Sequence, residues 1–144
     1  MSASRQVWLI AGETEPWCDP LAAQLVAQGM QIERIPSAQT ATWRHAAHMP
    51  EVRILPQLLV LSAAEARLDD WALLRLLDRA AVWRCLPRVV VAQPGDREAI
   101  TTSHALGAAN VVSLPPDNGP ESAERFARYW ARTTLLPTQE YLLG

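Results

Sequence analysis

Short apolar runs alternate with longer amphipathic stretches along the whole of this 144-residue chain. The apolar runs lie at residues 7–11, 57–62, 88–92 and 110–114, and a weaker strand pattern lies at 31–35 and is closed by Pro36. Short continuous apolar runs that end in turn residues are typical of strands buried on both faces of a parallel sheet. Because right-handed crossovers place helices on both faces of such a sheet, five strand–helix repeats predict an α/β fold with a doubly wound, five-stranded parallel sheet.

Turn and cap residues set the bounds of the predicted helices. The first helix carries Leu21, Leu25 and Val26, holds Pro20 in its first turn and ends at Gly29. Further helices are predicted over residues 37–49, 96–107 and 120–133. A Leu-rich helix is predicted from an Asp69 or Asp70 cap to about Ala81, with one face formed by Trp71, Leu74 and Leu77.

Composition narrows the class of protein. The length suits one domain, and a net charge of −2 with a pI near 5.9 argues against a nucleic-acid binder, which needs concentrated positive charge. The apolar runs are much shorter than the roughly 18 residues of a membrane span, and residues 1–6 contain no signal-peptide core. We therefore expect a cytoplasmic protein without membrane contact, with Cys18 and Cys85 reduced.

Three stretches, together with the strand order and spacing, resemble the receiver domain of bacterial two-component response regulators. They are QLLVLS at 57–62, LPRVVVA at 86–92 and ALGAANVVSLP at 105–115. The resemblance implies a flavodoxin-like (βα)5 receiver fold with strand order 2-1-3-4-5. It covers residues 1–133 and leaves residues 134–144 as a C-terminal extension.

The end of the chain is similar to that of the small stand-alone regulators that work beside bacterial phytochromes. In that subgroup the last helix ends in an aromatic–Trp pair and the chain continues to Leu-Pro. Here Tyr129 and Trp130 form the pair, and Leu135, Leu136 and Pro137 follow. The resemblance implies that these residues form a protein–protein interface, although Trp130 suits a position in the hydrophobic core equally well.

The resemblance implies a phosphorylation site that this chain has lost. A receiver needs an Asp nucleophile at the end of the third strand, a hydroxyl residue at the end of the fourth and a Lys after the fifth. These positions fall on Ser62, Ala92 and Leu114, with Pro115 preserved after the last. Phosphoryl transfer depends on positioning and charge neutralisation, so the three substitutions remove the groups that would do both.

The acidic pair that would hold Mg²⁺ after the first strand is also reduced. It falls on Ala11 and Gly12 if the strand end sets the register, or on Gly12 and Glu13 if the distance to Gly29 does. One carboxylate is the most that survives in either register. We therefore expect no metal site, since Mg²⁺ needs several oxygen ligands in near-octahedral geometry.

Other catalytic patterns are missing from the sequence. His45, His48 and His104 have no acidic or Cys partner at ligand spacing, and there is neither a phosphate-binding glycine loop nor a G-x-S-x-G motif. We expect no cofactor and no enzymatic activity.

The tail carries more apolar surface than a free end leaves in water. Its apolar residues include Leu135, Leu136, Tyr141, Leu142 and Leu143. The tail could dock on its own domain or pack across a symmetric homodimer, and the phytochrome-regulator resemblance favours the dimer.

The sequence therefore predicts a phosphorylation-independent pseudo-receiver that acts as a protein–protein interaction module in two-component signalling. Its partner would be a histidine kinase, a phytochrome-like sensor or another regulator. The alternative is a small-molecule sensor that uses the vacated pocket above Ser62, with a neutral lining of Ala11, Gly12 and Ala92.

Overall fold

The computed structural model describes residues 5–12, 15–114 and 121–133 of the chain, with five parallel strands in one sheet. The strands are β1 (Gln6–Ile10), β2 (Gln31–Ile35), β3 (Leu58–Ser62), β4 (Arg88–Val91) and β5 (Asn110–Val112). The helices are α1 (Cys18–Ala27), α2 (Ser37–Ala46), α3 (Ala63–Arg79), α4 (Arg97–Ala105) and α5 (Glu121–Thr133), with a 3-10 turn, η1, at Trp83–Cys85. The strand order is β2-β1-β3-β4-β5, as predicted.

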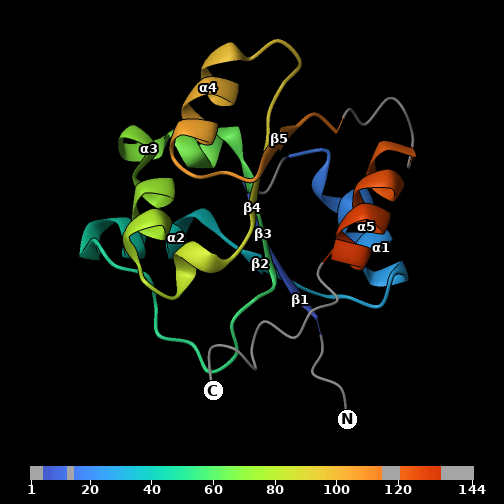
Figure 1. Ribbon diagram of the computed structural model, residues 1–144, viewed down its shortest axis with the longest axis horizontal. Helices are drawn as coiled ribbons and strands as arrows, with labels where there is room; N and C mark the ends of the chain where they lie inside the picture. The colour runs from blue at the N-terminus through green and yellow to red at the C-terminus, as the bar shows by residue number, and fades with distance from the viewer. Residues whose placement is uncertain (1–4, 13–14, 115–120, 134–144) are drawn as a thin grey trace.

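The helices form a layer on each side of the sheet. Helices α1 and α5 lie side by side on one face, and α2, α3 and α4 cover the other (Figure 1). This arrangement is the predicted doubly wound α/β fold of the receiver type. Among the described residues, no helix combines the length and hydropathy needed to cross a bilayer.

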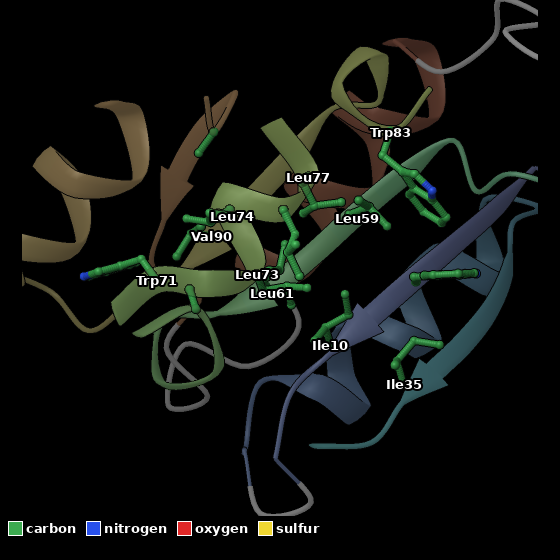
Figure 2. Close-up of a cluster of buried hydrophobic side chains, with 14 of the residues drawn as sticks. Ile10, Ile35, Leu59, Leu61, Trp71, Leu73, Leu74, Leu77, Trp83 and Val90 are labelled. Carbon is green, nitrogen blue, oxygen red and sulfur yellow. The ribbon is translucent and has the colours of Figure 1, made fainter. Parts of the chain in front are cut away.

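Alternate residues of each central strand enter different cores, which explains why the strands are apolar throughout. Trp8, Ile10, Leu59, Leu61 and Val90 face α2 and α3, where they meet the Leu-rich side of α3 (Figure 2). The intervening strand residues face α1 and α5; they are Val7, Leu9, Leu58, Val60 and Val89. Both faces of the three central strands are therefore packed, whereas the edge strands β2 and β5 are largely exposed.

The apolar side chains predicted for the first helix and for the Leu-rich helix occupy these cores, except Val26. Trp8 lies between Trp43 and Trp83, with ring centroids 5.8 and 5.2 Å away. Leu21 and Leu25 of α1 are buried, whereas Val26 is 58% exposed and faces solvent. Gly29 follows the helix with a φ of +85°, as a C-terminal cap requires.

The start of α3 differs from the prediction. The helix begins at Ala63 because the Ser62 hydroxyl accepts a hydrogen bond from the Glu65 amide at 3.0 Å and caps it. Asp69, Asp70 and Trp71 adopt left-handed backbone angles and break α3 into two helical segments. The predicted Leu-rich helix is the second segment, which begins just after this break and ends at Arg79 rather than at about Ala81. The other bounds match the prediction or shift by at most three residues, as at the earlier ends of β5 at Val112 and of α2 at Ala46.

Candidate functional site at the carboxyl edge of the sheet

The sheet register brings the predicted site residues to one edge. Ser62 is the last residue of β3 and pairs with Val91, the last residue of β4, so Ala92 comes directly after β4. Ala11 and Gly12 come directly after β1, whose Ile10 pairs with Leu61, and Leu114 comes two residues after β5. Glu13 and Pro115 lie outside the described residues.

The Ser62 side chain faces the interior. It is 1% exposed, and its oxygen accepts the hydrogen bond from the Glu65 amide that begins α3. A hydroxyl held in this way closes the first turn of a helix, a structural role that Ser fills well.

A cavity of about 520 Å³ opens beside Ser62 at the ends of β4 and β5. Ala92 and Leu114 line it, together with Trp17, Ala63 and Arg67. Ala11 and Gly12, which we expected in the same lining, instead border a second cavity of about 340 Å³ beside Cys18 and Arg34. The two sets of residues separate because β1 lies between β2 and β3, so β3 stands between the end of β1 and the end of β4.

An arginine that the sequence analysis did not single out forms part of the cavity wall. Arg67 Nη2 donates to both carboxylate oxygens of Asp96, at 2.5 and 2.6 Å, and its Nε donates to Glu98 at 3.0 Å. The guanidinium also lies 5.5 Å from the ring centroid of Trp71. Asp96 in turn accepts from the Ala99 amide at 3.1 Å and caps α4, at the first residue of the helix predicted over 96–107.

The pKa values follow from these contacts. Hydrogen bonds from Arg67 and from the Ala99 amide lower the pKa of Asp96, and the bonds to Asp96 and Glu98 raise the pKa of Arg67. Both groups are therefore ionised at neutral pH, and the positive charge of Arg67 is matched by neighbouring carboxylates.

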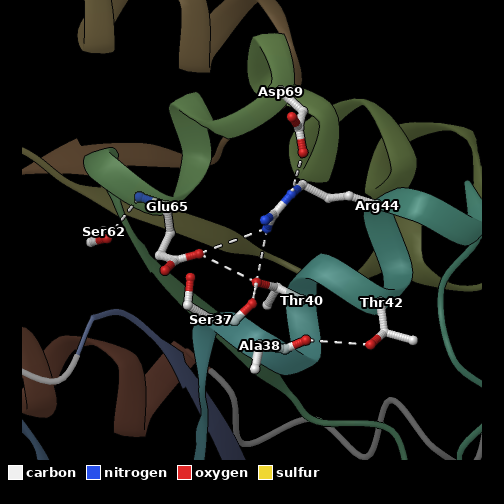
Figure 3. Close-up of polar contacts among 8 residues, drawn as sticks. All are labelled: Ser37, Ala38, Thr40, Thr42, Arg44, Ser62, Glu65 and Asp69. Atoms are coloured by element: carbon white, nitrogen blue, oxygen red, sulfur yellow. Dashed lines mark hydrogen bonds and ion pairs between the residues drawn. The ribbon is translucent and has the colours of Figure 1, made fainter.

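A second polar cluster lies on the other side of the same segment, between α2 and α3 (Figure 3). Arg44 Nε donates to Asp69 at 2.8 Å, and Arg44 Nη1 donates to the Thr40 hydroxyl at 2.9 Å. Glu65 is 5% exposed, with its Oε2 3.3 Å from the Thr40 hydroxyl and 3.9 Å from Arg44 Nη1. Sequence reasoning missed these residues because only the tertiary packing of α2 on α3 brings them together.

The described residues contain no group of three or more His, Cys, Asp or Glu side chains placed to hold a metal ion. Glu15 lines the larger cavity, and one of its carboxylate oxygens is buried with no hydrogen-bond partner among the described residues. Cys18 is a buried free thiol whose pKa burial raises to about 11, and Cys85 is a free, exposed thiol.

The predicted interface residues are described only in part. Tyr129 is 61% exposed on α5, whereas Trp130 is 6% exposed, packs near Phe126 and contacts the Tyr129 ring edge-on at 5.1 Å. A cavity of about 330 Å³ lies between β5 and these α5 side chains. The other predicted interface residues lie outside the described residues; they are Leu135, Leu136, Pro137, Tyr141 and Leu142.

The fold is that of response-regulator receiver domains. Among similar solved structures is the phosphorylated cyanobacterial phytochrome response regulator RcpA, with a TM-score of 0.74, 14% identity and coverage of 94% of this chain and 99% of that chain. The Mn²⁺-bound response regulator Rcp1 matches with a TM-score of 0.68 at 14% identity, over 91% of this chain and 98% of that one.

A third similar structure is the response regulator RPA3017 in red light signalling of R. palustris, with a TM-score of 0.58, 15% identity and coverage of 85% and 92%. No protein-family model matches the chain, and no curated protein matches it. At these identities the similarity establishes the fold, and the function has to be argued from the site.

Proposed function

We propose that this chain is a phosphorylation-independent receiver domain that acts as a protein–protein interaction module in two-component, phytochrome-type signalling in the cytoplasm. It binds a protein partner and catalyses no reaction. The partner is a histidine kinase, a phytochrome-like sensor or another regulator. The similarity to the phytochrome response regulators RcpA and Rcp1 supports this assignment to a pathway.

The chemistry at the carboxyl edge of the sheet carries the proposal. The strand ends that would supply the nucleophile, the hydroxyl and the ammonium group hold Ser62, Ala92 and Leu114. The Ser62 hydroxyl is buried and engaged with the Glu65 amide, so it is poorly placed to attack a phosphoryl group. Phosphoryl transfer from a histidine or a small donor needs Mg²⁺ and charge stabilisation, for which this edge offers few ligands.

Incubation with acetyl phosphate and Mg²⁺, followed by intact-mass measurement, tests the loss of phosphoryl transfer. We expect no added phosphoryl mass on the natural chain. The matched variant is Ser62→Asp, which restores the nucleophile alone and should also stay unlabelled because the metal ligands and the Lys are still missing. Stoichiometric labelling of the natural chain would contradict the proposal, and labelling of Ser62→Asp would show that the remaining site supports phosphoryl transfer.

We also propose that the chain forms a homodimer, whose interface consists of α4, β5, α5 and the C-terminal extension. The exposed Tyr129 and the cavity between β5 and α5 support this choice of face. Light scattering of a chain truncated after Thr133 should give a lower mass than the full chain. An unchanged dimer would remove the extension from the interface.

A second candidate function, small-molecule sensing, is favoured by the cavity of about 520 Å³ beside Ser62. A specific ligand would raise the unfolding temperature, because it binds the folded state alone. A thermal-shift panel of nucleotides and metabolites separates this candidate from the first, and a panel without any response would count against it.

A further inference from the structure

The segment that follows Ser62 is held by arginines on both of its sides. On one side, Arg44 of α2 contacts Asp69 and lies beside the buried Glu65. On the other, Arg67 extends from α3 across the cavity wall to Asp96 and Glu98. We call Arg67, Trp71, Asp96 and Glu98 the Arg67 cluster.

The geometry of the Arg67 cluster is more constrained than that of an ordinary surface ion pair. One guanidinium contacts two carboxylates and the Trp71 ring, and Arg67 and Asp96 are only 35% and 18% exposed at their side chains. Charge-assisted bonds that share one planar guanidinium fix both position and orientation. An isolated, fully exposed ion pair would fix neither the position nor the orientation of its side chains.

Both acidic partners belong to the start of α4. Asp96 is the N-cap residue of α4, and Glu98 lies in its first turn. Arg67 therefore ties the segment after β3 directly to the amino-terminal end of α4, across the mouth of the cavity at the carboxyl edge.

Apolar packing holds α4 only weakly. Its buried side chains are Ala99 and Ser103, both small, whereas Ile100 is 45% exposed. A helix that buries so little apolar area gains little from the hydrophobic effect. Its position should therefore depend strongly on the polar contacts at its first turn.

The backbone of the segment after Ser62 is strained in a way that needs such contacts. Asp69, Asp70 and Trp71 have φ values of +54°, +57° and +61°, and bulky residues such as Trp rarely adopt this left-handed conformation. Strained backbone persists where surrounding contacts over-determine it. Here Arg44 holds Asp69, and the Arg67 guanidinium covers Trp71, which is itself buried.

We infer that the Arg67 cluster is a conformational device that fixes α4 against the carboxyl edge of the sheet without a phosphoryl group, and that it thereby sets the α4 surface offered to a partner. The claim that a partner binds this α4 surface rests on the proposed function. The restraint on α4 itself depends only on the contacts described above.

Hydrogen–deuterium exchange of the full chain tests the restraint. In Arg67→Met, amides of Arg97–Ala105 should exchange about tenfold faster than in the natural chain, because the first turn of α4 loses its link to α3. Asp96→Asn is the matched variant: its amide oxygen can still cap the Ala99 amide, but the ion pair with Arg67 is lost. It should accelerate exchange in α4 as well.

The control is Arg128→Gln, which removes an exposed ion pair with Glu124 within α5 and should leave α4 unchanged. Exchange in α1 should stay the same in all three variants. If exchange in α4 stays within twofold of the natural chain in either Arg67→Met or Asp96→Asn, the inference is wrong. Raising the salt concentration gives a second readout that needs no variant, since screening of the ion pairs should accelerate exchange in α4 of the natural chain but not of Arg67→Met.

The outcome is independent of the labelling experiment, because no phosphoryl donor is present. If the natural chain accepts a phosphoryl group and exchange in α4 is faster in Arg67→Met, the proposed function alone would be wrong. If the natural chain stays unlabelled and hydrogen exchange in α4 is unchanged in both variants, this inference alone would be wrong.

Discussion

At the scale of single residues, a side chain at a predicted catalytic position can have a structural role. Ser62 occupies the strand end predicted for the nucleophile of a receiver, and its oxygen closes the first turn of α3. Gly107 has a comparable structural role at the opposite end of the sheet. Its φ is +95°, and it lies against Arg88, which is 3% exposed beside Asp78.

Gly107→Ala should lower the free energy of unfolding by about 2–3 kcal/mol, because a Cβ adds left-handed strain and displaces a buried charge from its partner. The added atom would lie 2.8 Å from Arg88 Nη2. Gly95→Ala is the matched control: its φ is +82°, but nothing lies within 4 Å of the added Cβ, so only the strain of about 1 kcal/mol applies. Equal losses in urea denaturation would contradict the role assigned to Arg88.

At the scale of the elements, the pattern of apolar runs predicted the strands, the helices and the doubly wound fold, whereas the strand order came from the resemblance to receiver domains. Short apolar runs in a doubly wound sheet have few alternatives, so the period of the sequence settles the architecture. The first segment of α3, which begins at Ala63, was not predicted, although the sequence carries a signal for it. Ser62 and Glu65 have the S-x-x-E spacing of a helix cap, which was overlooked because Ser62 had been assigned to a strand end.

Ser62→Ala should therefore destabilise the fold by about 1 kcal/mol through the loss of a helix cap. Thr42→Ala is a suitable control, because the Thr42 hydroxyl bonds only to the Ala38 carbonyl on the exposed side of α2 and should contribute within about 0.5 kcal/mol. Denaturant titration of both variants measures the difference. If Ser62→Ala were as stable as the natural chain, the capping role of Ser62 would be wrong.

The candidate site could be predicted only where it depends on strand ends. Ser62, Ala92 and Leu114 follow from the register of parallel strands, whose carboxyl ends meet at one edge. Arg44, Glu65 and Arg67 could not be predicted in the same way. Their contacts join residues that are 21 to 31 positions apart in the chain, and these contacts depend on how α2, α3 and α4 pack on the sheet.

At the scale of the whole molecule, the receiver fold has two packed cores, and ion pairs join its helices at the carboxyl edge, where we propose that phosphorylation chemistry has been lost. Two packed faces support the sheet, and Arg67 joins the segment after β3 to α4. A molecule built in this way should present the same surface whether or not a phosphoryl donor is present.

Light scattering of the full chain, with and without acetyl phosphate and Mg²⁺, tests this claim most directly. We predict one mass, that of a homodimer, under both conditions, because the surface does not depend on phosphorylation. A mass that changes when the donor is added would contradict the account.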